Sequence, residues 1–191
     1  MTRPYAFLCF LAWAMGGCGG SDKAAPARVA SVVFDIDGTL TVGTGLIDAF
    51  IARPDAAAAV QLYVDKGYRV VYVTGRPELI RGGTEDWIRR NHFPQLPLYM
   101  SSTLLLDDDQ TLNYKITTLH RLIEEEQRVF LYGYGDSTTD FEAYEAAGVP
   151  SNHTFALLRR GESTCQEGRY EACLNGYSDH LPYIEEQPDI R

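Results

Sequence analysis

Two aspartates at the end of an apolar run, Asp35 and Asp37, are the residues of this sequence best placed to do chemistry. Side chains of a strand alternate between its two faces, so residues two positions apart point the same way. Where the run ends in the Gly38 turn, both carboxylates can therefore face one crevice. Such a pair can divide the work, one acid serving as nucleophile or metal ligand and the other as proton carrier. Open α/β sheets bind their ligands at this position, the carboxyl end of a buried strand.

Further side chains suited to chemistry follow later apolar runs or lie in a helix. Thr74 and Gly75 follow the second run, Asp136 and Asp140 follow another, and Lys115 lies near the start of an expected helix. The apolar runs predict strands at 31–34, 69–73, 96–100, 128–133 and 154–158. Helices are expected at 46–50, 54–66, 77–91, 112–126 and 138–147. This alternation predicts an α/β fold, a three-layer α/β/α sandwich with a mainly parallel, Rossmann-like sheet. The sequence after 161 is expected to be irregular.

Composition and charge restrict the class of protein. The chain has 191 residues, 45% of them hydrophobic, and a formal net charge of −9. These values are typical of a globular protein, and the length fits one domain plus a leader. A protein that tracks a nucleic-acid backbone needs a basic surface, so nucleic acid is not expected as a main partner. Any anionic substrate must be held by a metal ion and a few local cations. Nothing in the sequence indicates an oligomeric state.

Residues 1–18 have the features of a processing segment. An arginine near the start precedes an apolar stretch at 6–15 that is short for a membrane span, and two glycines stand directly before Cys18. This pattern resembles the lipobox of bacterial lipoproteins, in which the cysteine becomes the lipidated first residue. An ordinary secretory signal cut near Gly20 is the alternative. We expect a lipoprotein signal peptide, a flexible tether at 19–30, and an exported protein anchored to a membrane through Cys18, facing the bacterial periplasm or the cell surface.

Cys165 and Cys173 are the cysteines outside the expected leader and anchor. An exported protein meets an oxidising compartment, so we expect these two to form a disulfide. A metal site is a weaker interpretation, because no nearby group of cysteines and histidines completes four ligands. The disulfide would close a small loop in a C-terminal extension at 161–191.

The order of the polar positions resembles that of the haloacid dehalogenase (HAD) superfamily of phosphotransferases. Its four motifs correspond, in order, to Asp35-Ile-Asp37-Gly-Thr39, Thr74, Lys115, and Gly135-Asp136-Ser-Thr-Thr-Asp140. The first motif is specific, whereas the other three depend on their order and spacing. The resemblance covers about 31–158 and implies a HAD-like catalytic domain at 31–160.

This resemblance implies a role for each residue. Asp35 would attack phosphorus to form an aspartyl-phosphate, and Asp37 would protonate the leaving group and then activate the hydrolytic water. Thr74, Gly75 and Lys115 would bind the substrate phosphate. The implied cofactor is Mg²⁺, because this hard cation prefers oxygen ligands. Its implied ligands are Asp35, Asp37 through its carbonyl, Asp136 and Asp140, the last in direct or supporting contact.

Each motif also has an interpretation without catalysis. A single Asp-x-Asp-Gly is often a surface turn or part of a calcium loop, but here a buried strand precedes it and no closing glutamate follows. Thr74 alone could be a strand-end hydroxyl, Lys115 a solvated lysine and Asp136 a helix cap. Arg76 would either add charge at the site or pair with a neighbouring acid. No motif gives a role to the four histidines, which we expect to be structural.

Predicted core elements fill the spans 38–73 and 75–114, which leaves no room for a sizeable cap domain. A capless site cannot enclose a small substrate, so it favours a phosphate carried on something bulky. Within the superfamily the chain resembles one capless branch, the lipin/Ned1/Smp2 (LNS2) domain of phosphatidate phosphatases. The segments with this resemblance are Asp35-Ile-Asp37-Gly-Thr-Leu-Thr41, Tyr72-Val-Thr-Gly-Arg-Pro77, Pro97-Leu-Tyr-Met-Ser-Ser102 and Leu131-Tyr-Gly-Tyr-Gly-Asp-Ser-Thr-Thr-Asp-Phe-Glu-Ala-Tyr144. Asp136 and Gly75 depart from the branch pattern, which usually has Asn and Ala there.

The resemblance implies Mg²⁺-dependent hydrolysis of a phosphomonoester, with phosphatidate or another lipid phosphate at the membrane as the suggested substrate. One alternative is a phosphatase for polynucleotide ends or small periplasmic phosphomonoesters. Another is a non-catalytic, phosphatidate-binding module of the LNS2 type, against which the retained pair Asp35 and Asp37 argues. Carbon–halogen hydrolysis ranks last, because it needs no second acid and usually a cap. Arg81, Arg89 and Arg90 either contact an anionic surface or form the solvated face of a helix.

Overall fold

The computed structural model of the chain describes residues 28–104 and 107–191. The expected signal peptide, Cys18 and most of the expected tether lie outside the described residues. The lipoprotein expectation therefore stays a prediction.

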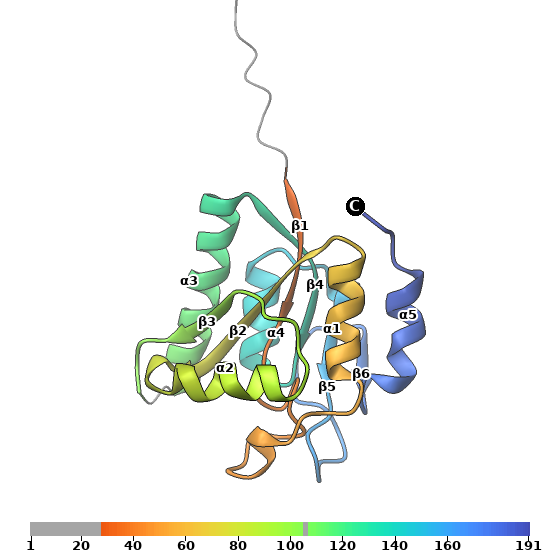
Figure 1. Ribbon diagram of the computed structural model, residues 1–191. Coiled ribbons are helices and arrows are strands. Elements are labelled where there is room, and N and C mark those ends of the chain that lie inside the picture. Colours follow the sequence, from red (N-terminus) through yellow and green to blue (C-terminus); the bar gives the residue numbers. More distant parts are fainter. Residues whose placement is uncertain (1–27, 105–106) are drawn as a thin grey trace, which may run out of the picture.

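Six parallel strands form the central sheet (Figure 1). In chain order they are β1 (Val29–Phe34), β2 (Arg69–Pro77), β3 (Leu98–Ser101), β4 (Arg128–Gly135), β5 (Thr154–Leu157) and β6 (Ala172–Leu174). Their order across the sheet is β3-β2-β1-β4-β5-β6, and every neighbouring pair is parallel. The chain builds outward from β1 to β3 and then returns to the other side of β1 with β4. The boundary between β1 and β4 is thus a topological switch point, where sheets of this kind bind ligands.

Helices cover both faces of the sheet (Figure 1). They are α1 (Ala56–Asp65), α2 (Arg81–Arg90), α3 (Asp108–Glu126), α4 (Thr138–Ala146) and α5 (Leu181–Glu186). Short 3-10 turns lie at η1 (Asp48–Phe50), η2 (Glu78–Ile80), η3 (Ser151–His153) and η4 (Ser178–His180). Core side chains of α1, α2 and α5 pack on one face, and those of α3 and α4 pack on the other. The predicted three-layer α/β/α sandwich is confirmed. Among the described helices, none has both the length and the apolar character that crossing a bilayer requires.

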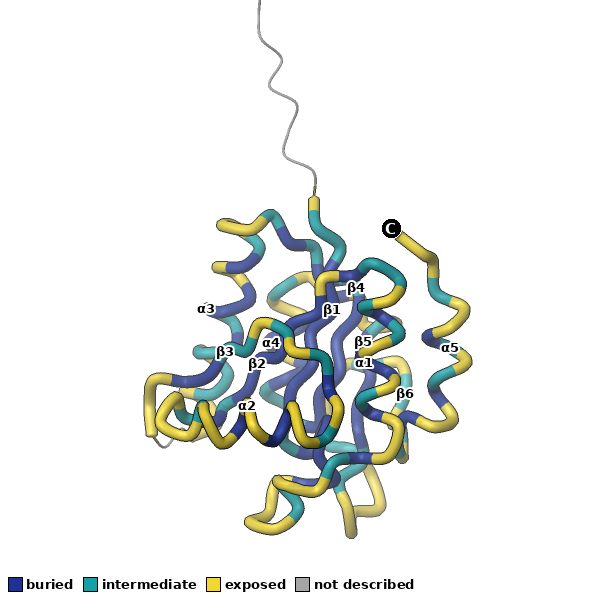
Figure 2. Tube along the Cα trace, viewed as in Figure 1, coloured by how far each residue is buried: buried dark blue, intermediate teal, exposed yellow. Residues whose placement is uncertain are grey.

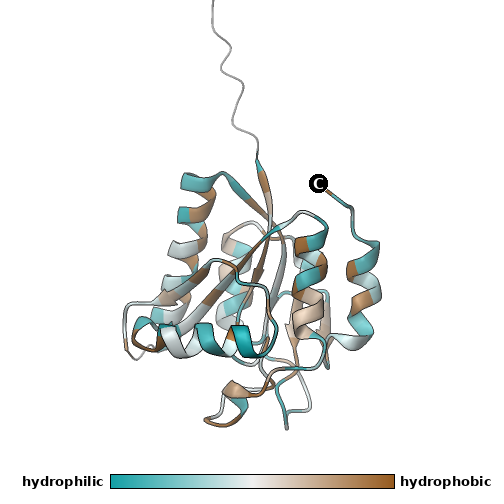
Figure 3. Cartoon of the chain, viewed as in Figure 1, coloured by the Kyte–Doolittle hydropathy of each residue, from teal (hydrophilic) through white to brown (hydrophobic). Residues whose placement is uncertain are grey.

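Alternation along β1 explains the two-sided core. Val32 and Phe34 belong to the cluster under α1 and α2, whereas Val33 belongs to the cluster under α3 and α4. All three side chains are fully buried, as expected for a strand in a parallel sheet covered on both faces. Figure 2 shows the buried strands inside an exposed shell of loops and outer helix faces, and Figure 3 shows the matching hydropathy.

The C-terminal region differs most from the prediction. The sequence after 161 was expected to be irregular, but β6 extends the sheet beside β5, with Ala156 opposite Cys173, and α5 packs against α1. A three-residue strand and a six-residue helix are too short to show a hydrophobic period, so the prediction was wrong there. The expected disulfide between Cys165 and Cys173 is present, with the two Cα atoms 5.8 Å apart.

Helix α3 begins earlier than expected. Asp107 caps its first turn in a capping box with Gln110, so the helix starts at Asp108 rather than at 112. Lys115 therefore lies two turns inside α3 and not near its start. In the described residues, the spans between the first three motifs hold only core elements and 3-10 turns, with no cap domain.

Candidate active site

The register of β1 and β4 places the first and fourth motifs side by side. Phe34 and Tyr134 are direct partners, and the ladder continues with the Asp35 amide donating to the Tyr134 carbonyl at 3.0 Å. Because both strands are parallel and end together, the residue after β1 and the residue after β4 reach the same edge of the sheet. Asp35 and Asp136 meet there.

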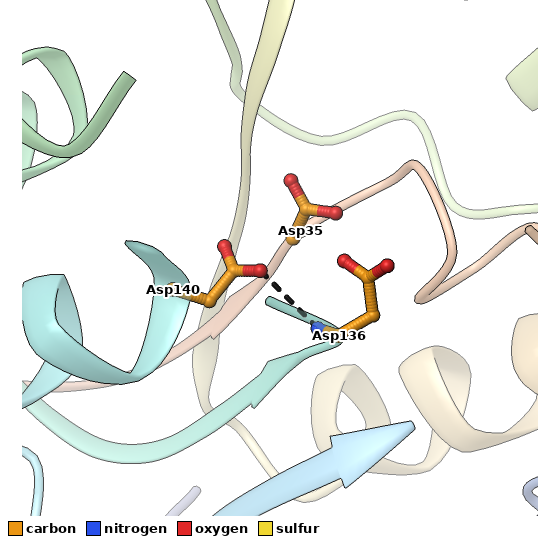
Figure 4. Close-up of side chains that lie close together, drawn as sticks. All are labelled: Asp35, Asp136 and Asp140. Atoms are coloured by element: carbon orange, nitrogen blue, oxygen red, sulfur yellow. Dashed lines mark hydrogen bonds between the residues drawn. The ribbon is translucent and has the colours of Figure 1, made fainter. Parts of the chain in front are cut away.

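Three carboxylates from these segments form a buried cluster, shown in Figure 4. One oxygen from each of Asp35, Asp136 and Asp140 lies within 4.8 Å of the other two. Asp35 and Asp136 are each 3% exposed and Asp140 is fully buried. We call these three residues the carboxylate cluster.

Lys115 supplies positive charge to the cluster from α3. Its Nζ donates to Asp35 Oδ1 at 3.0 Å and to Asp140 Oδ1 at 2.5 Å. Burial alone would lower the pKa of Lys115, but attraction to Asp140 and Asp35 outweighs it, so the pKa is raised above its usual value. The lysine therefore remains charged.

Lys115 and Arg159 together do not balance three buried acids. Burial raises the pKa of Asp35 well above its usual value, with Lys115 opposing the shift and the nearby aspartates adding to it. Burial also raises the pKa of Asp136 to about 7, helped by Asp140 and opposed by Arg159, whose Nε donates to Asp136 Oδ2 at 2.5 Å. The cluster thus carries excess negative charge that a bound cation would relieve.

Asp140 is fully engaged within the protein. Its Oδ2 accepts from the Asp136 amide at 3.2 Å, from the Ser137 amide at 3.1 Å and from the Ser137 hydroxyl at 2.7 Å. Its other oxygen accepts from Lys115. Asp140 therefore holds the β4–α4 turn and Lys115 in place, which fits the supporting contact among the two alternatives expected from the sequence.

Two glycines make the close approach of these acids possible. A Cβ on Gly38, which has a φ of +73°, would lie 1.9 Å from Asp136 Oδ2. A Cβ on Gly135 would lie 2.4 Å from the Cβ of Asp140. Contacts this short would force Asp136 or Asp140 to shift, and the positive φ at Gly38 adds strain for any other residue, so both positions favour glycine.

Asp37 lies apart from the cluster, in a more open setting. Its carboxylate is 25% exposed and accepts from Arg76 through Nε at 2.9 Å and Nη2 at 2.7 Å. Thr74 Oγ1 donates to the same carboxylate at 3.3 Å. The Arg76 amide in turn donates to Thr74 Oγ1 at 3.2 Å. We call Asp37, Thr74 and Arg76 the mouth of the site.

Most of the expected site residues are brought together, though not all in the expected contacts. Lys115 contacts two cluster acids, and Thr74 contacts Asp37. The Asp37 side chain is outside the cluster, so only its backbone carbonyl is left for the expected metal contact. At Gly75 a Cβ would meet Thr111 at 3.5 Å, an ordinary contact, so packing by itself does not demand glycine there.

Two arginines at the site had no place in the sequence interpretation. Arg159, just beyond β5, pairs with Asp136. Arg53 donates to the carbonyls of Gly38, Thr39 and Leu158 at 2.7, 3.2 and 3.0 Å, which ties the first-motif turn to the end of β5. Neither residue belongs to a motif. Only the position of Arg159 after a predicted strand could have drawn attention to it.

The donor set fits the implied magnesium ion. Three buried carboxylates face two cationic side chains, and carboxylate oxygens are the protein ligands that Mg²⁺ prefers. Within the cluster, Asp35 and Asp136 are the groups able to hold it, because Asp140 is already engaged. The Asp37 carbonyl stays a ligand implied by the family resemblance.

Comparison with known sequences finds relatives among lipid transfer proteins. The chain is 30% identical over 162 residues to membrane-associated phosphatidylinositol transfer protein 3 of Mus musculus, which covers 84% of this chain and 16% of that protein. It is 30% identical over 159 residues to membrane-associated phosphatidylinositol transfer protein 1 of Homo sapiens, with 81% and 12% covered. The chain therefore spans less than a fifth of the length of these relatives.

Comparison with solved structures agrees on the fold. A crystal structure of a HAD-like phosphatase from Mesorhizobium loti aligns with a TM-score of 0.53 and 20% identity, over 87% of this chain and 91% of that one. The expected HAD-like fold is thereby confirmed. The family model that matches residues 32–158 is described as the LNS2 domain of PITM 1–3, and its match spans both the carboxylate cluster and the mouth. The chain therefore belongs to the LNS2 domain family.

Proposed function

We propose that this chain is a magnesium-dependent phosphomonoester hydrolase that works through an aspartyl-phosphate on Asp35. The observation that supports this most is the contrast between the two aspartates of the first motif. Asp35 is buried against Lys115, whereas Asp37 is partly exposed and held at the mouth by Arg76. The nucleophile needs a fixed position beside a cation, which Lys115 gives Asp35, and the proton carrier needs access to substrate and water, which the partly exposed Asp37 has.

In the first step an Asp35 carboxylate oxygen forms a bond to phosphorus while the bond from phosphorus to the ester oxygen breaks. The leaving alkoxide takes a proton from Asp37, which becomes a carboxylate. Thr74 donates a hydrogen bond to a phosphoryl oxygen, and Lys115 orients Asp35 and opposes the rise that burial causes in its pKa. A magnesium ion held by Asp35, Asp136 and the Asp37 carbonyl would neutralise charge on the transferred group.

In the second step Asp37 takes a proton from a water molecule as the water oxygen attacks phosphorus. The bond between phosphorus and Asp35 breaks, which releases inorganic phosphate and restores the Asp35 carboxylate. Asp37 ends as it began, protonated. To exchange protons with substrate and water, its carboxylate must leave part of its contact with Arg76.

We propose a lipid phosphate, phosphatidate or a related phosphomonoester, as the substrate. The described chain has no cap to enclose a small molecule. The relatives carry membrane association and phosphatidylinositol transfer in their names, which supports a lipid ligand for this domain. Polynucleotide ends are less suitable for a chain with a net charge of −9.

A second candidate is a module that binds phosphatidate without hydrolysing it. It is favoured by one contact: the forked hydrogen bonds of Arg76 to Asp37 occupy the acid that would have to carry the proton. In such a module the cluster and the mouth would bind the phosphate group of phosphatidate without hydrolysing it.

Phosphate release from a panel of phosphomonoesters tests the proposal. The panel contains phosphatidate in mixed micelles, nucleotides and sugar phosphates, each with Mg²⁺ and with chelator, and the Asp35→Asn variant is the matched control. We expect release from phosphatidate that needs Mg²⁺ and is lost in the variant. Binding of phosphatidate with no release from any substrate would replace the hydrolase with the binding module.

We also propose export and anchoring through Cys18, supported by the leader pattern at 1–18. The wild-type chain should fractionate with membranes and gain the mass of the attached acyl chains. Cys18→Ser should abolish the mass increase. An unmodified Cys18, or a chain cut near Gly20, would contradict the anchor.

A further inference from the structure

Large apolar side chains stand exposed in three loops at the edge of the sheet that holds the site. Leu46, Ile47 and Phe50 are 94%, 75% and 60% exposed, and Leu79 and Ile80 are 81% and 42% exposed. Leu104, after β3, is 61% exposed. We call these six residues the apolar rim. Among the described residues, the only other large apolar side chains with such exposure are Ile51, in the first of these loops, and Ile190 near the C-terminus.

The rim shares one edge of the sheet with the active site. Its loops follow the carboxyl ends of β1, β2 and β3, and in a parallel sheet these ends lie together with Asp35. Figure 3 shows hydrophobic colour on the loop around η1, at the lower edge of the molecule in that view. Val29 at the start of β1 and the C-terminus lie at the opposite edge (Figure 1).

Hydrogen bonds fix the rim to the mouth of the site. Arg76, which binds Asp37, also donates to the Ala49 carbonyl at 2.6 Å, and its guanidinium lies 5.7 Å from the centre of the Phe50 ring. Trp87 Nε1 donates to the Phe50 carbonyl at 2.9 Å. The η1 loop is therefore held in place by these hydrogen bonds, and the fold itself keeps the apolar side chains at its tip exposed.

The charged side chains beside η1 and η2 are paired with one another. Arg81 binds Glu78 next to Leu79, and Arg160 binds Asp48 at 2.9 Å beside the η1 loop. Paired charges cost less to bring toward an apolar medium than isolated ones. The pairing of Arg81 also argues against the expected alternative in which free arginines of α2 contact an anionic surface.

The shape of the rim favours a lipid surface over a protein groove. Its members are tips of separate turns that project outward, and none of them lines the recesses bounded by Arg159 and His180, by Tyr68 and Arg128, or by Glu145. Projecting Leu, Ile and Phe side chains suit shallow insertion among lipid headgroups, where each gains by leaving water. Several large apolar side chains exposed at one edge of the molecule point to an interaction site there.

We propose that the apolar rim inserts into a phospholipid surface and places the mouth of the site at the level of the headgroups. The part of this inference that concerns substrate access rests on the proposed function. With Val29 at the far edge, an anchor at the N-terminus would not by itself turn the site toward a membrane. The rim supplies that orientation.

Vesicle binding tests the rim without any need for turnover. The full chain in a Cys18→Ser background is compared with the same chain carrying Leu46→Ser, Ile47→Ser and Leu79→Ser, none of which contacts the cluster or the mouth. Sedimentation with phosphatidylcholine vesicles, with and without phosphatidate, should show binding weakened about tenfold or more in the triple variant. Hydrolysis of a water-soluble phosphomonoester should stay within about twofold, while hydrolysis of phosphatidate in vesicles falls about tenfold or more.

Ile190→Ser is the matched control, an exposed isoleucine at the opposite edge, and should leave vesicle binding unchanged. Equal binding by wild type and triple variant would overturn the proposal. So would a wild-type dimer that the triple variant converts to a monomer, because the rim would then be an interface between two copies. If no substrate is hydrolysed but vesicle binding is normal and depends on the rim, the proposed hydrolase function is rejected and the proposed membrane contact of the rim is retained.

Discussion

The carboxylate cluster and the mouth of the site sit next to each other and are built on different principles. In the cluster, Asp35, Asp136 and Asp140 are nearly or fully buried and engage Lys115 or Arg159. At the mouth, Asp37 is a quarter exposed and shares Arg76 with the η1 loop. Buried charges depend on every partner, whereas partly exposed ones can exchange partners with water. A change in the cluster should therefore affect folding and chemistry together, and a change to the Asp37 side chain should affect chemistry more than folding.

Removing Lys115 should give the largest effect. Lys115→Met leaves Asp35 and Asp140 buried beside each other without their cation, and breaking a buried pair in this way costs about 3–5 kcal/mol of unfolding free energy. Activity should be lost as well. Urea unfolding in the presence of chelator measures the cost, and added Mg²⁺ should recover part of it, because an ion that binds only the folded state stabilises it.

Lys66→Met is the control for this variant. Lys66 Nζ donates to the carbonyls of Glu185 and Gln187 near the surface, so its loss should cost about 1 kcal/mol. Equal losses for the two lysine variants would mean that the cluster does not depend on its cation.

Replacing Asp37 should separate the two regions most clearly. Asp37→Asn keeps the size of the side chain but cannot carry the proton, so the rate of phosphate release should fall about 10²–10⁴-fold. The unfolding free energy should fall by about 1–2 kcal/mol, less than for Lys115→Met, because the asparagine side chain can still accept a hydrogen bond from the buried Arg76 and is partly exposed. Steady-state kinetics and urea unfolding of the same preparation measure both. A variant as unstable as Lys115→Met would show that cluster and mouth are one unit.

The sequence predicted the cluster better than the mouth, for physical reasons. Asp35 and Asp136 directly follow β-branched or aromatic runs, so the strands and the switch point place them with little ambiguity. Arg76 came with two open alternatives, and the structure favours its pairing with a neighbouring acid. Arg159 reaches Asp136 only because β5 lies beside β4 in the folded sheet, and no local sequence pattern predicts such a long-range ion pair. The strand β6 was not predicted for a different reason: three residues are too few to show the alternation of apolar and polar residues that indicates a strand.

The exposure of the apolar rim could not be predicted from local sequence either. The expected helices at 46–50 and 77–91 include Leu46, Ile47 and Leu79, and apolar residues at a helix start are normally interpreted as core. In the structure Leu46 and Ile47 lie in the turn before η1 and Leu79 lies in η2, and all three side chains are exposed. Apolar composition alone could not tell an inward face from an outward one.

Gly38 tests how closely the turn between cluster and mouth is packed. Gly38→Ala should cost about 2–3 kcal/mol, from the strained positive φ and from displacement of Asp136, and should weaken Mg²⁺ binding. Gly45→Ala in the same loop meets nothing within 4 Å and should change stability by less than about 0.5 kcal/mol. Calorimetric titration with Mg²⁺ and urea unfolding measure the two effects. Unchanged metal binding in Gly38→Ala would mean that Asp136 can move without loss.

The pH dependence of stability should separate the cluster from the rest of the core by its sign. Burial lowers the pKa of His180 from 6.5 to about 4, where its Nε2 lies 3.0 Å from the Tyr134 hydroxyl. As the pH falls below 6.5 the unfolded chain binds this proton and the folded protein does not. Stability is therefore lost from pH 6.5 down to about 4, by at most about 1.4 kcal/mol per unit.

Asp136 acts in the opposite direction when no metal is bound. Its pKa is raised from 3.8 to about 7, so the folded protein binds the proton first and gains stability as the pH falls from about 7 toward 3.8. Asp35 adds to this gain. Relative to wild type in chelator, His180→Gln should become more stable as the pH falls from 6.5 to 4, and Asp136→Asn less stable. Urea unfolding at several pH values measures both differences. Slopes of the same sign would show that the excess charge of the cluster is balanced by some other group, and the need for a bound cation would lose its main physical support.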